Sequence, residues 1–119
     1  MNRPISSDPD LLSVRDMLQA PLDPILVDPA RLRVMAALVG LPADGRIGFT
    51  ALGRLLDLTD GNLGRHMHVL MEMGYVGMVK EQHGRRPRSL YAATPAGRAA
   101  FAAHTGALEG IIAAAHNPF

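Results

Sequence analysis

The feature that most constrains the fold is a three-residue connection, residues 57–59, between two short amphipathic segments. Residues 50–56 and 60–73 carry apolar side chains at spacings of three and four, which predicts a helix on each side. Thr59 can cap the second helix with its hydroxyl. Two amphipathic helices joined this closely have the spacing of a helix-turn-helix unit.

A hairpin with a basic tip is predicted directly after the second helix. Residues 75–80 and 89–93 have strand composition, and residues 82–87, which include Gly84, form the expected turn between them. Three arginines lie in or beside this turn: Arg85, Arg86 and Arg88. A basic hairpin in this place makes the pattern more specific than a helix-turn-helix unit alone, because it corresponds to a wing.

Three more helices are predicted, near residues 10–20, 29–39 and 95–115, with starts marked by the capping residues Asp10, Asp28 and Thr94. Pro29 and Pro95 follow two of these caps, and proline is favoured at the first position of a helix. A very short strand is expected at residues 47–49, with Thr50 capping the helix after it.

These elements predict a mainly α, α+β fold: a winged helix-turn-helix with a two-stranded β wing and terminal dimerisation helices. The expected organisation is an N-terminal tail and dimerisation helix at 1–21, a winged helix core at 22–94 and a C-terminal dimerisation helix at 95–119. A chain of 119 residues is long enough for one hydrophobic core.

Composition narrows the function classes. The absence of cysteine excludes disulfides, iron–sulfur clusters and cysteine-based zinc sites. Aromatic residues make up only 4%, which argues against a stacking platform for single-stranded nucleic acid. The sequence has no apolar run long enough for a membrane span and no secretory signal, so we expect a soluble, cytoplasmic protein.

Several segments between Leu52 and Pro95 carry a family resemblance: the stretch from Leu52 to Leu70, Gly74-Tyr75-Val76, Gly84-Arg85-Arg86-Pro87-Arg88, Tyr91 and Thr94-Pro95. With these segments the sequence resembles winged-helix regulators related to the multiple-antibiotic-resistance (MarR) and arsenical-resistance (ArsR) repressors. The similarity covers roughly residues 22–112 and is greatest to a short, one-domain bacterial subgroup. This resemblance implies a dimeric protein that binds double-stranded DNA and regulates transcription.

The second helix of the pair has one face suited to the major groove. At about 100° per residue, its apolar residues gather on one side, and Arg65 and His68 lie opposite, with Asn62 beside them. Arginine can read guanine, and asparagine can read adenine. The expected DNA-contacting residues of this helix are Thr59, Asp60, Asn62, Arg65 and His68. An ordinary solvated helix face is the alternative.

The wing is expected to bind the DNA backbone or a narrow minor groove through Arg85, Arg86 and Arg88. The charge distribution agrees with a local anionic contact in the second half of the chain. Residues 1–60 carry six Arg and eight Asp, whereas residues 61–119 carry five Arg, one Lys and three acidic residues. The alternative is a hairpin tip that is charged only for solubility.

The last helix carries apolar residues in a short seam with many small residues, which permit close helix packing. We expect a homodimer interface formed by Leu11, Val14, Leu18, Phe101, Leu108 and Ile111. Packing of the last helix onto the chain's own core is the alternative. A dimer would place two recognition helices about one DNA turn apart and predicts an inverted-repeat site.

No catalytic arrangement stands out, so we expect no enzyme, no cofactor and no metal site within one chain. His66 and His68 lie about 200° apart on a helix and cannot share an ion. A small-molecule effector remains open, with a pocket expected near Met35, Phe101 and Leu108. The sequence also leaves open a winged-helix module that binds a protein instead of DNA.

Overall fold

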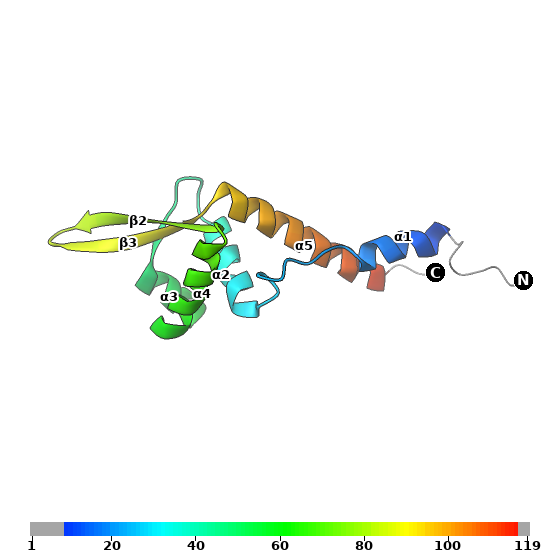
Figure 1. Cartoon of the computed structure of the whole chain (residues 1–119), viewed down its shortest axis with the longest axis horizontal. Helices are drawn as coiled ribbons and strands as arrows, with labels where there is room; N and C mark the ends of the chain where they lie inside the picture. Colours follow the sequence, from blue (N-terminus) through cyan, green and yellow to red (C-terminus); the bar gives the residue numbers. More distant parts are fainter. Residues whose placement is uncertain (1–8, 117–119) are drawn as a thin grey trace, which may run out of the picture.

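The computed structural model describes the backbone of residues 9–116 and the side chains of residues 13–82 and 84–116. Its elements, in chain order, are α1 (Pro9–Leu18), α2 (Pro29–Val39), β1 (Ile47–Gly48), α3 (Phe49–Leu56), α4 (Asp60–Glu72), β2 (Val76–His83), β3 (Arg86–Ala93) and α5 (Pro95–Ala115). The α+β winged helix predicted from the sequence is therefore confirmed (Figure 1).

Three of the expected helix caps are present. Asp28 accepts hydrogen bonds from the backbone N–H groups of Ala30 and Arg31, at 2.9 and 3.1 Å. The hydroxyls of Thr59 and Thr94 cap α4 and α5 in the same way. Each of these caps satisfies backbone donors that the first turn of a helix leaves without partners.

The predicted cap at Thr50 is wrong. The N-cap of α3 is Gly48, which makes no side-chain cap, and the helix begins at Phe49. The reason is tertiary: Gly48 still pairs with Leu90 in the sheet, and the chain turns into α3 directly from that pairing. The helix start is therefore fixed by the strand and not by a capping side chain.

The core lies between α2, α3, α4 and the base of the sheet. Its fully buried side chains come from all three helices and from the segment before α2: Leu26, Val34, Met35, Leu38, Leu52, Leu63 and Leu70. Burying an aliphatic side chain of this size stabilises a fold by roughly 1.5–3 kcal/mol. This core holds α4 by its apolar face and leaves its polar face outside.

The sheet has three antiparallel strands in the order β1-β3-β2, not only the two strands of the wing. The wing is also longer than expected, because Gln82 pairs with Pro87 and only Gly84 and Arg85 form the turn. β1 reaches only Leu90 and Tyr91, so the outer half of β3 has no second neighbour. Proline is tolerated at such a sheet edge, where its missing N–H costs little.

The two terminal helices form an arm that extends from the core on the side opposite the wing (Figure 1). α1 packs along α5 of the same chain and ends at Leu18, before the expected Ala20. The radius of gyration is 19.1 Å, whereas a compact domain of this length has about 13 to 14 Å. Val14 is only 2% exposed, so the chain itself covers this predicted interface residue.

Candidate nucleic-acid interface

The outward face of α4 carries the side chains expected to contact DNA. Thr59, Asp60, Asn62, Arg65 and His68 are all exposed. Arg65 Nη2 donates to Asn62 Oδ1 at 3.4 Å, one helical turn earlier, so the two candidate base-reading groups lie side by side. The sequence prediction for this face agrees with its exposure, and the structure leaves it open to a ligand.

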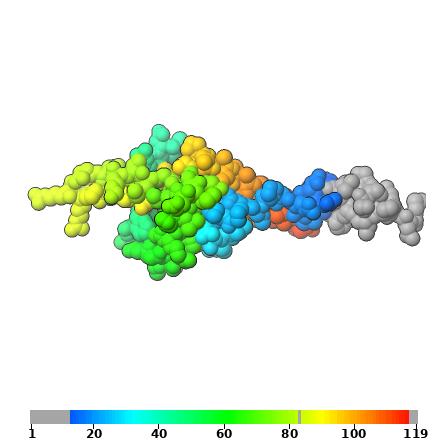
Figure 2. Space-filling view, in the orientation of Figure 1, coloured from blue at the N-terminus to red at the C-terminus, as the bar shows by residue number. Residues whose placement is uncertain are grey.

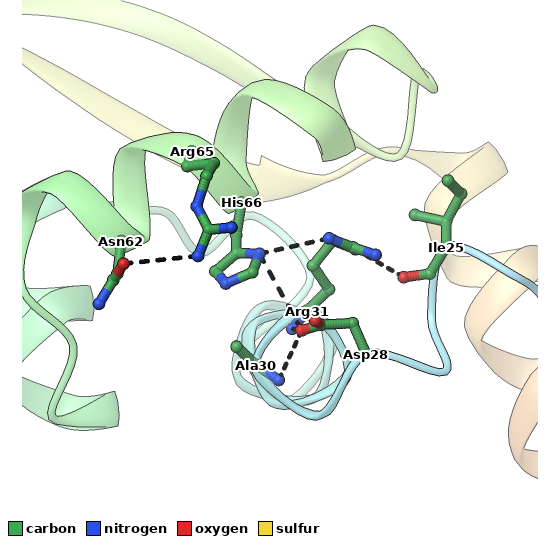
Figure 3. A network of polar contacts seen from close by, with 7 residues as sticks. All are labelled: Ile25, Asp28, Ala30, Arg31, Asn62, Arg65 and His66. Carbon is green, nitrogen blue, oxygen red and sulfur yellow. Dashed lines mark hydrogen bonds and ion pairs between the residues drawn. The ribbon is translucent and has the colours of Figure 1, made fainter.

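The inward face of α4 attaches the helix to the core. Leu63, Met67 and Leu70 are buried, as the helical spacing predicts. His66 is also buried, at 5% exposure, and points toward the start of α2 (Figure 3). The direction of the exposed face is therefore set by an apolar stripe together with one polar residue.

His68 has a carboxylate partner on its own helix. Its Nε2 lies 3.8 Å from Glu72 Oε1, with both side chains more than 70% exposed. Such exposed pairs contribute little to stability. A protonated His68 would offset part of the negative charge that Glu72 presents to a phosphate. Within the described residues, no group of three or more potential ligands is placed to hold a metal ion.

The wing projects from the core as a thin finger (Figure 2). Arg85 and Arg86 are exposed at its tip. Arg88 is half exposed and has an acidic neighbour across the hairpin, with its Nη2 3.7 Å from Glu81 Oε1. The tip therefore presents Arg85 and Arg86 fully, while the charge of Arg88 is shared with Glu81.

A groove of about 530 Å³ lies between the start of α3 and β3, and its lining includes the side chains of Arg54 and Arg88. The first residues of α3 and Ser89 border the same groove. Arg54 is a candidate that the sequence reasoning missed. The sequence signal for Arg54 was its position on an exposed edge of the helix, four residues after Thr50. Arg54 and Arg88 line the same groove because β1, which leads into α3, pairs with β3.

A second cavity, of about 380 Å³, lies where the arm meets the core. It is formed by the segment 21–25, by Met73 and Tyr75 after α4, and by the first half of α5 including His104. None of the residues Met35, Phe101 and Leu108 lines either of these two cavities, and the pocket expected near them stays a prediction. Met35 is fully buried in the core.

The arm exposes apolar side chains along its length. Leu18 on α1 is 55% exposed and Ile112 on α5 is 59% exposed. Leu108 and Ile111 are half-buried, and Phe101 packs against the core. The side chain of Leu11, also expected at an interface, lies outside the described residues. Ile112 is an exposed arm residue that the sequence reasoning did not name.

No helix in residues 9–116 is long and apolar enough to cross a membrane.

The fold is similar to that of several solved proteins. A transcriptional regulator homologue from Pyrococcus horikoshii OT3 aligns with a TM-score of 0.68 and 27% identity, over 86% of this chain and 95% of that chain. RV1404 from Mycobacterium tuberculosis aligns with a TM-score of 0.63 and 22% identity, over 91% and 72%. A MarR-like transcriptional regulator from Thermotoga maritima gives 0.54 and 17%, over 92% and 74%.

No curated protein matches the chain. Residues 30–112 match the family described as the winged helix DNA-binding domain, and this match covers the core, the wing and most of α5. Since that span is well over half of the sequence, the chain belongs to the winged helix DNA-binding domain family.

Proposed function

We propose that the protein is a sequence-specific transcriptional regulator that binds double-stranded DNA as a homodimer and acts as a repressor. The observation that carries the proposal is the common exposure of the polar face of α4 and the arginines of the wing, on a core that buries the other face of α4. A helix presented in this way can enter the major groove.

In this proposal α4 reads bases. Arg65 donates two hydrogen bonds to a guanine edge, and Asn62 bonds to a neighbouring adenine. The contact between Arg65 and Asn62 holds both groups on the same side of the helix before DNA arrives. Thr59, Asp60 and His68 lie at the borders of this surface, where hydroxyl and imidazole groups can contact sugar and phosphate oxygens.

The wing and the groove beside α3 bind the sugar–phosphate backbone of DNA. Arg85 and Arg86 reach phosphates or a narrow minor groove from the tip of the hairpin. Arg88 and Arg54 line one groove with the start of α3, where backbone N–H groups favour an anion. A phosphate in that groove would fix how far α4 enters the major groove, because α3 and α4 are joined by only three residues.

The arm supplies the dimer contact. Two helices packed side by side leave Leu18 and Ile112 exposed, and small residues on α5 permit close approach of another helix. Under the proposal, residues 1–21 and 95–119 dimerise and residues 22–94 bind DNA. Two-fold symmetry then predicts an inverted-repeat operator with half-sites about one DNA turn apart. A dimer on such an operator represses by covering the promoter.

The test compares arginine variants in DNA titrations at several salt concentrations. Replacing Arg85, Arg86 and Arg88 with alanine should weaken binding to all sequences and flatten the dependence on salt. Arg65→Ala should instead relax the preference at one base position, by about 1–3 kcal/mol. Arg15→Ala on the arm, far from the wing, removes one positive charge, as Arg65→Ala does, and serves as the control for that variant. Unchanged DNA affinity in the wing variant would favour a protein-interaction module.

A further inference from the structure

His66 lies on the same helix as the candidate base-reading residues but belongs to a different set of contacts. Its Nδ1 is 3.4 Å from Arg31 Nη1 and 4.0 Å from Asp28 Oδ1, at the start of α2 (Figure 3). Arg31 is held in place from its other end, where Nε donates to the carbonyl of Ile25 at 2.7 Å. The buried imidazole of His66 therefore connects α4 to α2, and His66 directly follows the candidate base-reading residue Arg65 in the sequence.

The contact with Arg31 decides which ring nitrogen of a neutral imidazole carries the proton. A guanidinium has only donors, so His66 Nδ1 must accept, and the ring proton must be on Nε2. If the imidazole gains a second proton, Nδ1 becomes a donor facing another donor. Two cationic groups would then lie 3.4 Å apart, one of them on an imidazole whose residue is only 5% exposed. The hydrogen bond between α4 and α2 would be lost.

Asp28 cannot replace the lost contact without cost. Its Oδ1, the atom nearest His66, already accepts the two backbone hydrogen bonds that cap α2. The backbone hydrogen bond from Arg31 and the nearby guanidinium charge of Arg31 hold the pKa of Asp28 below its ordinary value, although partial burial opposes this. The carboxylate is thus charged at neutral pH, and it would attract a protonated His66 away from Arg31.

We propose that His66 is a positioning residue for DNA recognition: as a neutral acceptor for Arg31 it holds α4 in the orientation that reads bases, and its protonation displaces α4 and reduces sequence discrimination. This rests on the proposed DNA-binding function. Arg31 and Asp28 are the charged groups that face His66 from α2 and its cap, and its neighbours on α4, Asn62 and Arg65, are exposed. Among the described residues, no hydrogen bond or ion pair joins the His66 side chain to α3 or β2.

The test uses full-length protein in which His68 and His83 are both replaced by glutamine, because these two histidines lie on elements proposed to meet DNA. The measured quantity is the ratio of affinities for a duplex from the gene's own upstream region and for a scrambled duplex, at pH 7.5 and 5.5 and fixed ionic strength. The ratio is expected to fall about three- to tenfold on acidification, the effect of losing one hydrogen bond. Adding His66→Gln, which keeps an acceptor for Arg31 but cannot be protonated, should abolish that fall.

Two further variants complete the design. His104→Gln makes the same change at another buried histidine, which lies on α5 and accepts from the N–H of Asp23, and it should leave the acid response intact. Arg31→Gln provides a neutral donor for His66 and should reduce the response, so the test remains decisive if the His66 variant does not fold. Retention of the full acid response by both His66→Gln and Arg31→Gln, or its loss in His104→Gln, would overturn the proposal.

An NMR titration of the free protein separates this proposal from the proposed function. The backbone amide signals of Asn62 and Arg65 should shift between pH 7.5 and 5.5, and the shifts should vanish with His66→Gln. If no duplex binds at any pH, the DNA-binding function fails, and amide shifts that disappear with His66→Gln still support the positioning of α4. Amide shifts that persist unchanged in that variant contradict the positioning role with or without DNA.

Discussion

The hydroxyl of Tyr75 donates a hydrogen bond of 2.6 Å to Asp23 Oδ2, across 52 residues of sequence. The other carboxylate oxygen of Asp23 accepts from the N–H of Ile25 at 2.8 Å, and the N–H of Asp23 donates to His104 Nδ1 at 2.9 Å. Asp23 therefore ties together the segment before α2, the start of the wing and the middle of α5. This is the joint between the DNA-binding core and the arm.

Removing the hydroxyl of Tyr75 should loosen that joint. We expect Tyr75→Phe to lower the free energy of unfolding by about 1–2 kcal/mol at pH 7, because a hydrogen bond to a charged group is lost. Urea unfolding measures this. Tyr91→Phe is the matched control, since the Tyr91 hydroxyl makes no hydrogen bond within the described residues. An equal loss of stability in the two variants would contradict the assignment.

The same hydrogen bond predicts a change of stability at alkaline pH. The hydrogen bond to Asp23, with burial and the charge of that carboxylate, raises the pKa of Tyr75 above 10.0. Its contribution to stability is thus fully present below pH 10 and is lost as the pH rises through the raised pKa of the folded state. Unfolding curves across this range should show a steeper alkaline loss in the wild type than in Tyr75→Phe. Parallel curves would contradict this.

Gly97 should not tolerate any side chain. An ideal Cβ at this position would lie 2.1 Å from the carbonyl oxygen of Tyr75 and 3.0 Å from Met35 Cε. That carbonyl accepts from the N–H of Thr94 and cannot move freely. We expect Gly97→Ala to cost at least about 2 kcal/mol of stability by overpacking. Thermal unfolding provides the measurement.

Gly106, on the same helix, is the control for this effect. A Cβ there meets nothing within 4 Å. Since alanine is favoured over glycine in a helix by about 1 kcal/mol, Gly106→Ala should be neutral or stabilising. If the two substitutions have the same effect on the melting temperature, the close approach of α5 to Tyr75 is not what restricts residue 97.

Asp28 should contribute to stability through its cap on α2. Asp28→Ala is expected to cost about 0.5–2 kcal/mol, and Asp44→Ala in the exposed loop before β1 should cost little. The pKa of Asp28 is lowered from 3.8, so this contribution is present above pH 3.8 and disappears as the pH falls through the lower folded value. Acid unfolding curves of the wild type and of Asp28→Ala should converge in that window. Curves that stay a constant distance apart would contradict the lowered pKa.

The arm should control the oligomeric state. Replacing Leu18 or Ile112 with aspartate places a charge on an exposed apolar surface, which should convert a dimer to a monomer with little loss of helix content. Sedimentation equilibrium measures the molecular mass. Leu55→Asp, at a residue 65% exposed on α3, is the matched control and should remain dimeric. A wild-type protein that is monomeric at tens of micromolar would contradict the proposed role of the arm.

Local chemistry explains which parts of this structure could be predicted from sequence. The caps at Asp28, Thr59 and Thr94 and the left-handed turn at Gly74 depend on a few adjacent residues, so the helix limits they set were predicted closely. The start of α3 was misplaced because it depends on pairing between Gly48 and Leu90.

The candidate site also has a part that could be predicted from local sequence and a part that depends on contacts between distant segments. The outward face of α4 follows from helical periodicity, and the exposure of Arg65 agrees with it. The groove that joins Arg54 to Arg88 depends on contacts between segments distant in the chain. The same holds for the contact of Arg31 with His66, 35 residues apart. A helical wheel assigns His66 to the edge of the core but cannot identify its partner.

The most direct test of the central claim, that α4 and the wing form a sequence-specific DNA-binding surface, is a fluorescence anisotropy titration of the purified protein. The duplexes are the gene's own upstream region and a scrambled sequence, at several salt concentrations. With about six phosphate contacts in a dimer, the log–log salt slope should be about −5, and the upstream duplex should bind at least roughly a thousandfold more tightly. Equal binding of the two duplexes, or no binding of either at low salt, would contradict the claim.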